Sequence, residues 1–324
     1  METKNPFSRR DFIKTMSLAG ASVPFISMTR PEFQKNHAPD PDAWKIYLFS
    51  KHFQFLDYDE AAEATKELGF DGVDLTVRRG GHVLPENVTR DLPRAVNAFE
   101  KKGLKVKMMA SSVNDAQDQY TESVLKTASG LGIQYYRMAW YKYGNDMGLE
   151  QSLIHFEKKM ERLGELNAKY GINGCYQNHC GRNFVGAPVW DLWMLIKDFD
   201  PQVISSQYDI HHATVEGGMA WPLGLNLLRH HIKTIAIKDF QWKEKNDNWP
   251  IIEVPLGQGW VDFDSYFEKL KILNIEVPIT LHVEYPLFKS DNLSKKEKRK
   301  QASESIKKDL EYVKNLLQKH GLRA

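Results

Sequence analysis

The sequence predicts a single-domain (β/α)₈ barrel over residues 43–324. Two observations support it. Short runs rich in β-branched and aromatic residues alternate with longer segments of helical periodicity along the chain. Gly69, Gly103, Gly132 and Gly171 each stand between a helical segment and the next strand, where a helix-ending glycine is favoured. Such alternation indicates parallel strands joined by right-handed crossovers, and eight units in about 280 residues are typical of a closed barrel.

Eight strands and eight helices are expected. The strands cover Lys45–Phe49, Gly72–Val77, Leu104–Met109, Gln134–Met138, Ile172–Gln177, Val203–Asp209, Thr234–Lys238 and Pro278–Glu284. The helices cover Tyr58–Leu68, Arg90–Lys102, Gln117–Leu131, Leu149–Tyr170, Pro188–Phe199, Trp221–His231, Phe263–Leu273 and Lys298–Lys319. The alternative is a doubly wound open sheet, which normally carries a glycine-rich phosphate turn after its first strand. This chain continues there with Ser50-Lys51-His52-Phe53 instead.

The first 30 residues are expected to be an export signal. Ser8-Arg9-Arg10-Asp11-Phe12-Ile13-Lys14 is a twin-arginine pattern, and a short apolar stretch, Met16–Met28, follows it. Residues 31–42 are expected to form a linker. We therefore expect an exported, periplasmic protein that has no membrane contact once the signal is removed.

Composition excludes some classes of partner. The 44 basic and 42 acidic residues nearly cancel, so no nucleic acid or anionic membrane is expected as a partner. No dinucleotide fingerprint or P-loop is present, so no nucleotide cofactor is expected. The two cysteines, Cys175 and Cys180, are too far apart along an extended strand to pair without a sharp turn. Free thiols are expected, with a local bridge as the alternative.

Charged and polar residues cluster at the carboxyl ends of the predicted strands. Residues that point into a barrel alternate along each strand, and the last of them reaches the face where sites form. Each candidate also has a structural explanation, such as an ion pair between Arg137 and Asp74 or between Lys238 and Asp239. Together they favour a site, because burying so many polar groups without a purpose is costly. The candidates are His52, Asp74, Arg78, Arg137, Gln177, His179, Asp209, His212, Lys238, His282 and Glu284.

The motifs at these strand ends resemble the xylose isomerase-like TIM-barrel superfamily of sugar phosphate isomerases and epimerases, in its exported twin-arginine branch. The resemblance covers roughly residues 43–320. It rests on Gly69–Leu75, Tyr176–His179, Tyr208–His212, Ile237–Asp239 and His282–Glu284. It implies a barrel that acts on a small carbohydrate, and it leaves open whether the chain forms a homo-oligomer.

The resemblance also implies a divalent-metal site with Glu, Asp, His and Glu ligands. The matching positions here are Gln177, Asp209, Ala236 and Glu284. Asp209 and Glu284 keep the pattern, whereas Gln177 is a weaker ligand and Ala236 offers none. The remaining oxygen donors would suit Mg²⁺, Mn²⁺ or Ca²⁺, and loss of the metal is the alternative.

By the same resemblance, the expected activity is that of a sugar isomerase or epimerase that removes a proton beside a carbonyl. Glu284 is the expected base, Lys238 the group that stabilises the oxyanion, and His212 or His179 a second acid–base with a pKa near working pH. The expected substrate-binding residues are Asp74, Arg78, Arg137, Gln177, His179 and His282. A non-catalytic carbohydrate-binding barrel is the alternative. A three-zinc phosphodiesterase of the same fold is disfavoured, because ligands are missing and there is no basic face.

Overall fold

Eight parallel strands close into a barrel in the computed structural model, which describes residues 40–290 and 292–322. The strand order around the barrel is β1-β10-β7-β6-β5-β4-β3-β2, so neighbours in sequence are neighbours in space. The strands are β1 (Ile46–Phe49), β2 (Gly72–Val77), β3 (Lys105–Ser111), β4 (Tyr135–Arg137), β5 (Asn173–Gln177), β6 (Ile204–Asp209), β7 (Ile232–Ile237) and β10 (Ile279–Leu281). The predicted (β/α)₈ barrel is confirmed.

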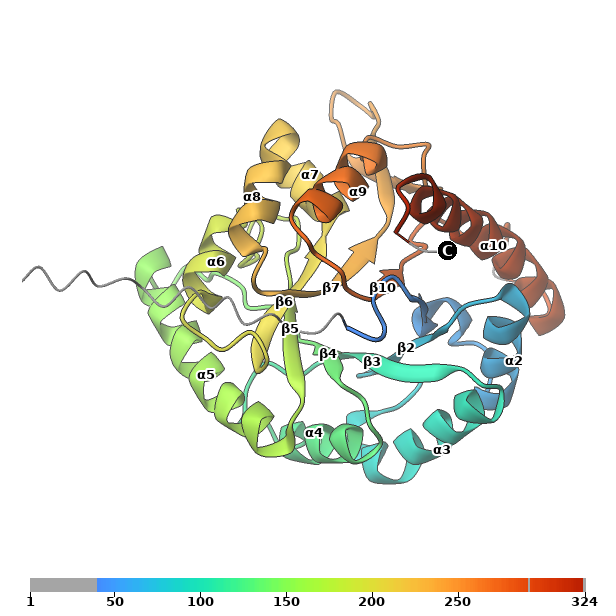
Figure 1. Cartoon of the computed structure of the whole chain (residues 1–324), viewed down its shortest axis with the longest axis horizontal. Coiled ribbons are helices and arrows are strands. Elements are labelled where there is room, and N and C mark those ends of the chain that lie inside the picture. The colour runs from blue at the N-terminus through green and yellow to red at the C-terminus, as the bar shows by residue number, and fades with distance from the viewer. Residues whose placement is uncertain (1–39, 291, 323–324) are drawn as a thin grey trace, which may run out of the picture. The chain divides into compact units, whose positions relative to one another are not determined.

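Helices surround this barrel (Figure 1). They are α2 (Tyr58–Leu68), α3 (Val88–Lys101), α4 (Thr121–Gly130), α5 (Leu149–Tyr170), α6 (Trp190–Ile196), α8 (Trp221–Leu228), α9 (Phe263–Ile272) and α10 (Lys295–Lys319). Short 3₁₀ helices cover Ser50–Phe53, Pro85–Asn87 and Gly218–Ala220. Gly69 and Gly171 end their helices in the left-handed conformation, with φ of 84° and 62°, as their positions in the sequence predict.

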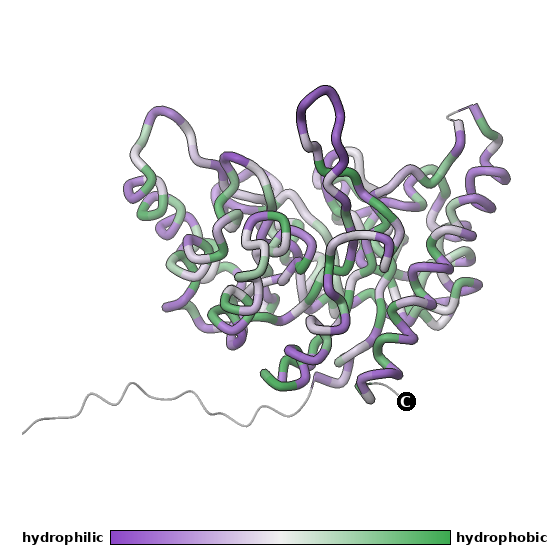
Figure 2. The backbone as a smooth tube through the Cα atoms, turned by 90° about the horizontal axis from the view of Figure 1, so that it is seen from above, coloured by the Kyte–Doolittle hydropathy of each residue, from purple (hydrophilic) through white to green (hydrophobic). Residues whose placement is uncertain are grey.

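Nearly every strand residue is buried, because the helices cover the outside of the sheet and side chains fill the inside. Along the helices, hydrophobic and hydrophilic stretches alternate within each turn (Figure 2), as expected for helices with one face on the barrel. Trp190 departs from this pattern. It is 58% exposed at the start of α6.

Two elements were absent from the sequence prediction. Helix α7 (Ile210–Gly217) begins directly after β6, because the Asp209 side chain accepts a hydrogen bond from the backbone N–H of His212 and caps the helix. The second element is an antiparallel hairpin, β8 (Asp239–Trp242) with β9 (Ile251–Val254), which follows β7. No helix or strand was predicted in either place.

Asp239 holds the base of the hairpin. Its carboxylate accepts hydrogen bonds from four backbone N–H groups, those of Phe240, Gly257, Gly259 and Val261, at 2.8–3.2 Å. An added Cβ at Gly259 would lie 2.0 Å from this carboxylate, so only glycine fits there. Asp239 is therefore a structural residue and does not pair with Lys238.

Both cysteines are free, as predicted. The expected export signal lies outside the described residues, as does most of the expected linker. Asp42, at the end of that linker, is buried and forms ion pairs with Lys45 and Lys105. No helix in the described part of the chain is both long and apolar enough to cross a bilayer.

A buried carboxyl on α10 predicts how stability depends on pH. Burial raises the pKa of Asp309 to about 6, although Tyr285 and the backbone N–H of Leu256 donate hydrogen bonds to it. The unfolded chain has a pKa near 3.9 at this group, so its stabilising effect is complete below about pH 4 and is lost as the pH rises through about 6. Asp309→Asn should therefore stabilise the protein by about 1–3 kcal/mol at pH 7.5 relative to the parent, and should not do so at pH 4.

Urea unfolding at the two pH values measures this difference. Asp247→Asn, in the exposed hairpin loop, is the control and should have the same small effect at both. Equal stability of Asp309→Asn and the parent at pH 7.5 would contradict the assignment.

Candidate active site

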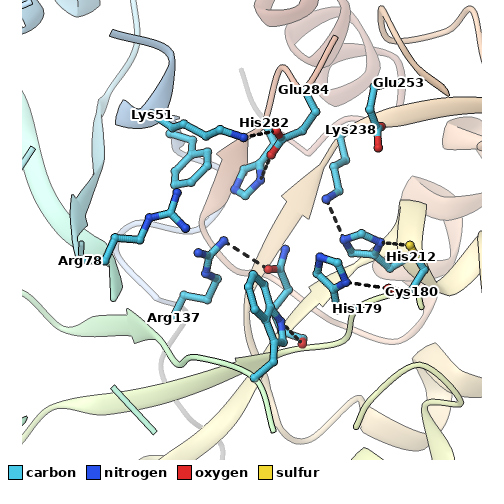
Figure 3. A pocket seen from close by; sticks show the side chains of 13 residues that line it. Lys51, Arg78, Arg137, His179, Cys180, His212, Lys238, Glu253, His282 and Glu284 are labelled. Atoms are coloured by element: carbon cyan, nitrogen blue, oxygen red, sulfur yellow. Dashed lines mark hydrogen bonds and ion pairs between the residues drawn. The ribbon is translucent and has the colours of Figure 1, made fainter. Parts of the chain in front are cut away.

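A cavity of about 330 Å³ opens at the carboxyl ends of the barrel strands (Figure 3). It is lined by Phe49, Lys51, Arg78, Arg137, Trp140, Gln177, His179, Cys180, His212, Lys238, Glu253, His282 and Glu284. The structure therefore brings together most of the predicted site residues on one face. The exceptions are His52, Asp74 and Asp209, which do not line the cavity.

Lys238 lies at one side of the cavity, directly after β7. Its Nζ donates a hydrogen bond to His212 Nε2 at 2.7 Å and lies 3.3 Å from Asp209 Oδ2. Because an ammonium only donates, Nε2 of His212 carries no proton. Asp209 is fully buried beneath this pair, and Gln177 Nε2 also donates to its Oδ2 at 2.8 Å. Asp209 thus anchors the ammonium and does not face the cavity.

Glu284 lies on another side of the cavity, next to Lys51 and His282. Lys51 Nζ is 2.5 Å from its Oε2, and His282 Nδ1 is 3.6 Å from its Oε1. Burial by itself raises the pKa of Glu284, but the neighbouring His282 and the charges of Lys238 and Lys51 outweigh it. The pKa lies below its ordinary value, and Glu284 is ionised at neutral pH. Burial lowers the pKa of His282 to about 4, so His282 is neutral there.

His179 and His212 were expected to titrate near working pH, but their surroundings shift both pKa values downward. Burial, reinforced by the charge of Lys238, lowers the pKa of His179 to about 4 and that of His212 well below its ordinary value. Both are neutral at pH 7. His179 Nδ1–H donates to the carbonyl oxygen of Cys180 at 2.8 Å, which leaves Nε2 of His179 as a free acceptor.

Aromatic rings and two arginines complete the wall. The guanidinium of Arg137 lies 4.8 Å from the centre of the Trp140 ring, and Trp140 Nε1 donates to the carbonyl oxygen of Gln177 at 3.1 Å. His179 packs edge-on against Trp140, with ring centroids 4.6 Å apart. The cavity therefore offers flat apolar surfaces beside charged groups, a combination suited to a polyol that has both C–H faces and hydroxyl groups.

Besides Asp209, two predicted residues lie outside the cavity. His52 is buried and its Nε2 accepts a hydrogen bond from the backbone N–H of Val283 at 2.9 Å, so it has a structural role. Asp74 lies inside the barrel, where its Oδ2 accepts a hydrogen bond from Thr280. Burial raises the pKa of Asp74 to about 6 despite the charge of Arg137. Asp74 and Arg137 form no ion pair within 4.0 Å.

Residues 62–316 match the family model described as xylose isomerase-like TIM barrel. The chain belongs to this family. The match spans most of the barrel and includes all the cavity-lining residues from Arg78 onward. The family predicted from the strand-end motifs is confirmed. No curated protein matches the chain in sequence.

Solved structures of sugar epimerases share this xylose isomerase-like fold. A D-allulose 3-epimerase from Methylomonas sp. is 17% identical with a TM-score of 0.61, over 86% of this chain and 100% of the other. The 3-keto-D-glucoside 4-epimerase from E. coli is 16% identical with a TM-score of 0.61, over 84% and 99%. A D-psicose 3-epimerase from Clostridium cellulolyticum H10, solved with D-tagatose, is 10% identical with a TM-score of 0.62, over 84% and 99%. At these identities the likeness shows the fold.

The ligand set that the family resemblance implies does not fit a metal in this structure. Asp209 Oδ2 already accepts from Gln177 Nε2 and lies beside the Lys238 ammonium, so positive charge and donors surround the oxygen that a cation would need. Other donors do cluster among the described residues. His179, Cys180 and His212 form one group, and Asp209, His211 and His212 another, each with ligand atoms within 4.8 Å. Neither group includes Glu284.

Sequence reasoning missed five cavity residues: Phe49, Lys51, Trp140, Cys180 and Glu253. Lys51 could not be found by strand alternation, because the chain enters a 3₁₀ helix at Ser50, and this helix turns Lys51 toward the cavity and His52 away from it. Glu253 comes from the unpredicted hairpin, where its Oε2 lies 3.3 Å from His211 Nε2. Of these five residues, Cys180 is the one that the sequence could have indicated, because it directly follows the Asn178-His179 motif.

Proposed function

We propose that this protein is an enzyme that removes a proton from the carbon beside a carbonyl group of a sugar or keto-sugar. In this proposal the Lys238 ammonium replaces the metal ion. One observation carries it: Lys238 Nζ lies against Asp209, the retained ligand position, and lines the same cavity as the ionised carboxylate of Glu284. A fixed positive charge near a base is what proton removal to an enediolate requires.

The steps follow from the contacts. Glu284 takes the proton from carbon, and the electron pair moves into the carbonyl, whose oxygen gains negative charge. Lys238 stabilises that oxygen through its ammonium group. Asp209 and His212 hold Lys238 in place, because both contact Nζ. The proton on Glu284 then returns to carbon, or another group supplies one.

His179 is the proposed second acid–base. Its Nε2 is the unprotonated nitrogen, because Nδ1–H donates to Cys180, and it enters the cavity from a different side than Glu284 (Figure 3). Removal of the proton by Glu284 and its return by the same group support isomerisation. Inversion of a carbon requires return on the other side, so His179 Nε2 must first take up a proton from solvent, and Glu284 releases its own proton to solvent afterwards. Substrate orientation is assigned to Arg78, Arg137, Gln177 and His282, which line the cavity. Asp74 does not line the cavity and would contribute to substrate orientation from beneath these residues.

The location of the protein is part of the proposal. The Ser8–Lys14 pattern supports export by the twin-arginine route to the periplasm. This route carries folded proteins, which is compatible with a barrel whose cavity is lined by residues of one chain. A free or oxidised sugar, or a glycoside fragment, would be the substrate there.

The test combines metal analysis with a sugar panel. The purified protein should convert at least one ketose or keto-sugar in deuterated water, with deuterium incorporated at a single carbon, and chelation should leave the rate unchanged. The alternative, a carbohydrate-binding barrel without catalysis, is supported by the absence of the expected metal ligands at Gln177 and Ala236. Sugar binding without deuterium incorporation would favour that alternative, and a rate abolished by chelation would overturn the role given to Lys238.

A further inference from the structure

Two arginines from different strands lie side by side in the cavity wall. Arg137 ends β4, and Arg78 follows β2 directly. Both guanidinium groups pack over the ring of Phe49, with Cζ 5.5 Å and 5.6 Å from its centre. Figure 3 shows the two groups close together and turned toward the open cavity. They form a paired cationic surface on the side away from Cys180 and His212.

Neither arginine has an anionic partner. Arg137 is 5% exposed, and within the part of the chain that the structure describes its Nε has no hydrogen-bond partner, while Nη1 donates to Gln177 Oε1 at 3.4 Å. In residues 40–290 and 292–322, no ion pair within 4.0 Å involves Arg78 or Arg137. Asp74 is the buried acid that partly balances their charge, and one of its oxygens is taken by Thr280.

The other cations of the cavity differ in this respect. Lys51 is paired with Glu284, and Lys238 with Asp209. The excess positive charge is therefore concentrated at the two arginines. A buried guanidinium with unused donors is costly unless a counter-ion completes it. Burial and the neighbouring charge of Arg78 lower the pKa of Arg137 to about 10. The lowered pKa has the same cause, because a charged guanidinium without a counter-ion is unfavourable at this position.

Stacking on Phe49 explains how both arginines are held, and Arg137 also packs on Trp140, but this packing leaves the Nε–H of Arg137 without an acceptor. The planar fork of a guanidinium matches two oxygens of one anionic group, and two forks can grip it from two sides. We infer that Arg78 and Arg137 bind an anionic oxygen group of the substrate, a carboxylate or a phosphate, so that the substrate is an acidic sugar. This inference rests on the proposed function in that it names the ligand class of the same cavity.

Isothermal titration calorimetry with the full protein tests the inference. The probes are D-glucuronate and D-galacturonate for the carboxylate, D-glucose 6-phosphate for the phosphate, and neutral D-glucose and D-galactose for comparison. At least one acidic sugar should bind about tenfold more tightly than its neutral counterpart, and added salt should weaken that binding. Binding of a uronate would identify the anionic group as a carboxylate, and binding of D-glucose 6-phosphate would identify it as a phosphate.

Arg78→Met and Arg137→Met should each weaken acid binding by about tenfold or more, and each should weaken acid binding clearly more than neutral-sugar binding. Arg79→Met is the matched control, because Arg79 is exposed next to Arg78, and it should bind like the parent. Arg137→Met should unfold at the same or a higher temperature than the parent, because it removes a buried charge without an anionic partner. If it fails to fold, Arg78→Met alone decides.

The failure of this inference can be told apart from failure of the proposed function. Conversion of neutral sugars with no preference for acids, or no acid binding at millimolar concentration, would overturn the anion site alone. Arginine-dependent acid binding without deuterium incorporation into any bound sugar would support the anion site and contradict the proposed catalysis.

Discussion

Replacing Glu284 by Gln is expected to lower kcat by about 10²–10⁴ on any sugar that the protein converts, with little change in binding. Gln keeps the shape of the side chain and can still contact Lys51 and His282, but it cannot accept a proton from carbon. Because the native carboxylate is already ionised at neutral pH, the loss should persist across the neutral range.

Glu253→Gln is the matched control for this experiment. Glu253 also lines the cavity, but it has no proton-transfer role in the proposal, so its variant should keep a rate within a few-fold of the parent. Deuterium exchange at the substrate carbon is the readout that isolates the chemical step. Unchanged exchange in Glu284→Gln would remove Glu284 from the mechanism.

Replacing Lys238 by Met is expected to lower kcat by about 10²–10³, the usual effect of removing one group that stabilises an oxyanion. The same variant should lose about 3–5 kcal/mol of stability, because Asp209 then becomes an uncompensated buried charge. These two losses have different causes and can be separated. Urea unfolding measures the loss of stability, and kcat measures the loss of catalysis.

The double variant Lys238→Met with Asp209→Asn separates them. Removing both charges should restore much of the stability, while turnover stays low because no ammonium faces the substrate. Recovery of turnover together with stability would show that Lys238 only supports the fold. Recovery of turnover on adding Mg²⁺ or Mn²⁺ to the double variant would instead show that the cavity still accepts a metal.

The fold could be predicted because its signals are local. Strand runs, helical periodicity and glycines such as Gly69 and Gly171 each act within a few residues, and right-handed crossovers then leave little choice of topology. The strand-end positions of Gln177, Lys238 and Glu284 followed from the same alternation and from the family motifs. The hairpin after β7 was missed, because Asp239 organises it through backbone N–H groups up to Val261, and sequence patterns do not reveal such contacts.

The sequence by itself determined the family, the barrel and the face on which charged residues gather, because these depend on periodicity and on motifs. Only the tertiary structure decided how those residues are paired and protonated. It placed Lys238 against Asp209, gave Glu284 the neighbour Lys51, made His179 and His212 neutral, and left the guanidinium of Arg137 without an anion. The reason is physical: pairing and pKa depend on burial and on neighbours far away in the chain, which only folding brings together.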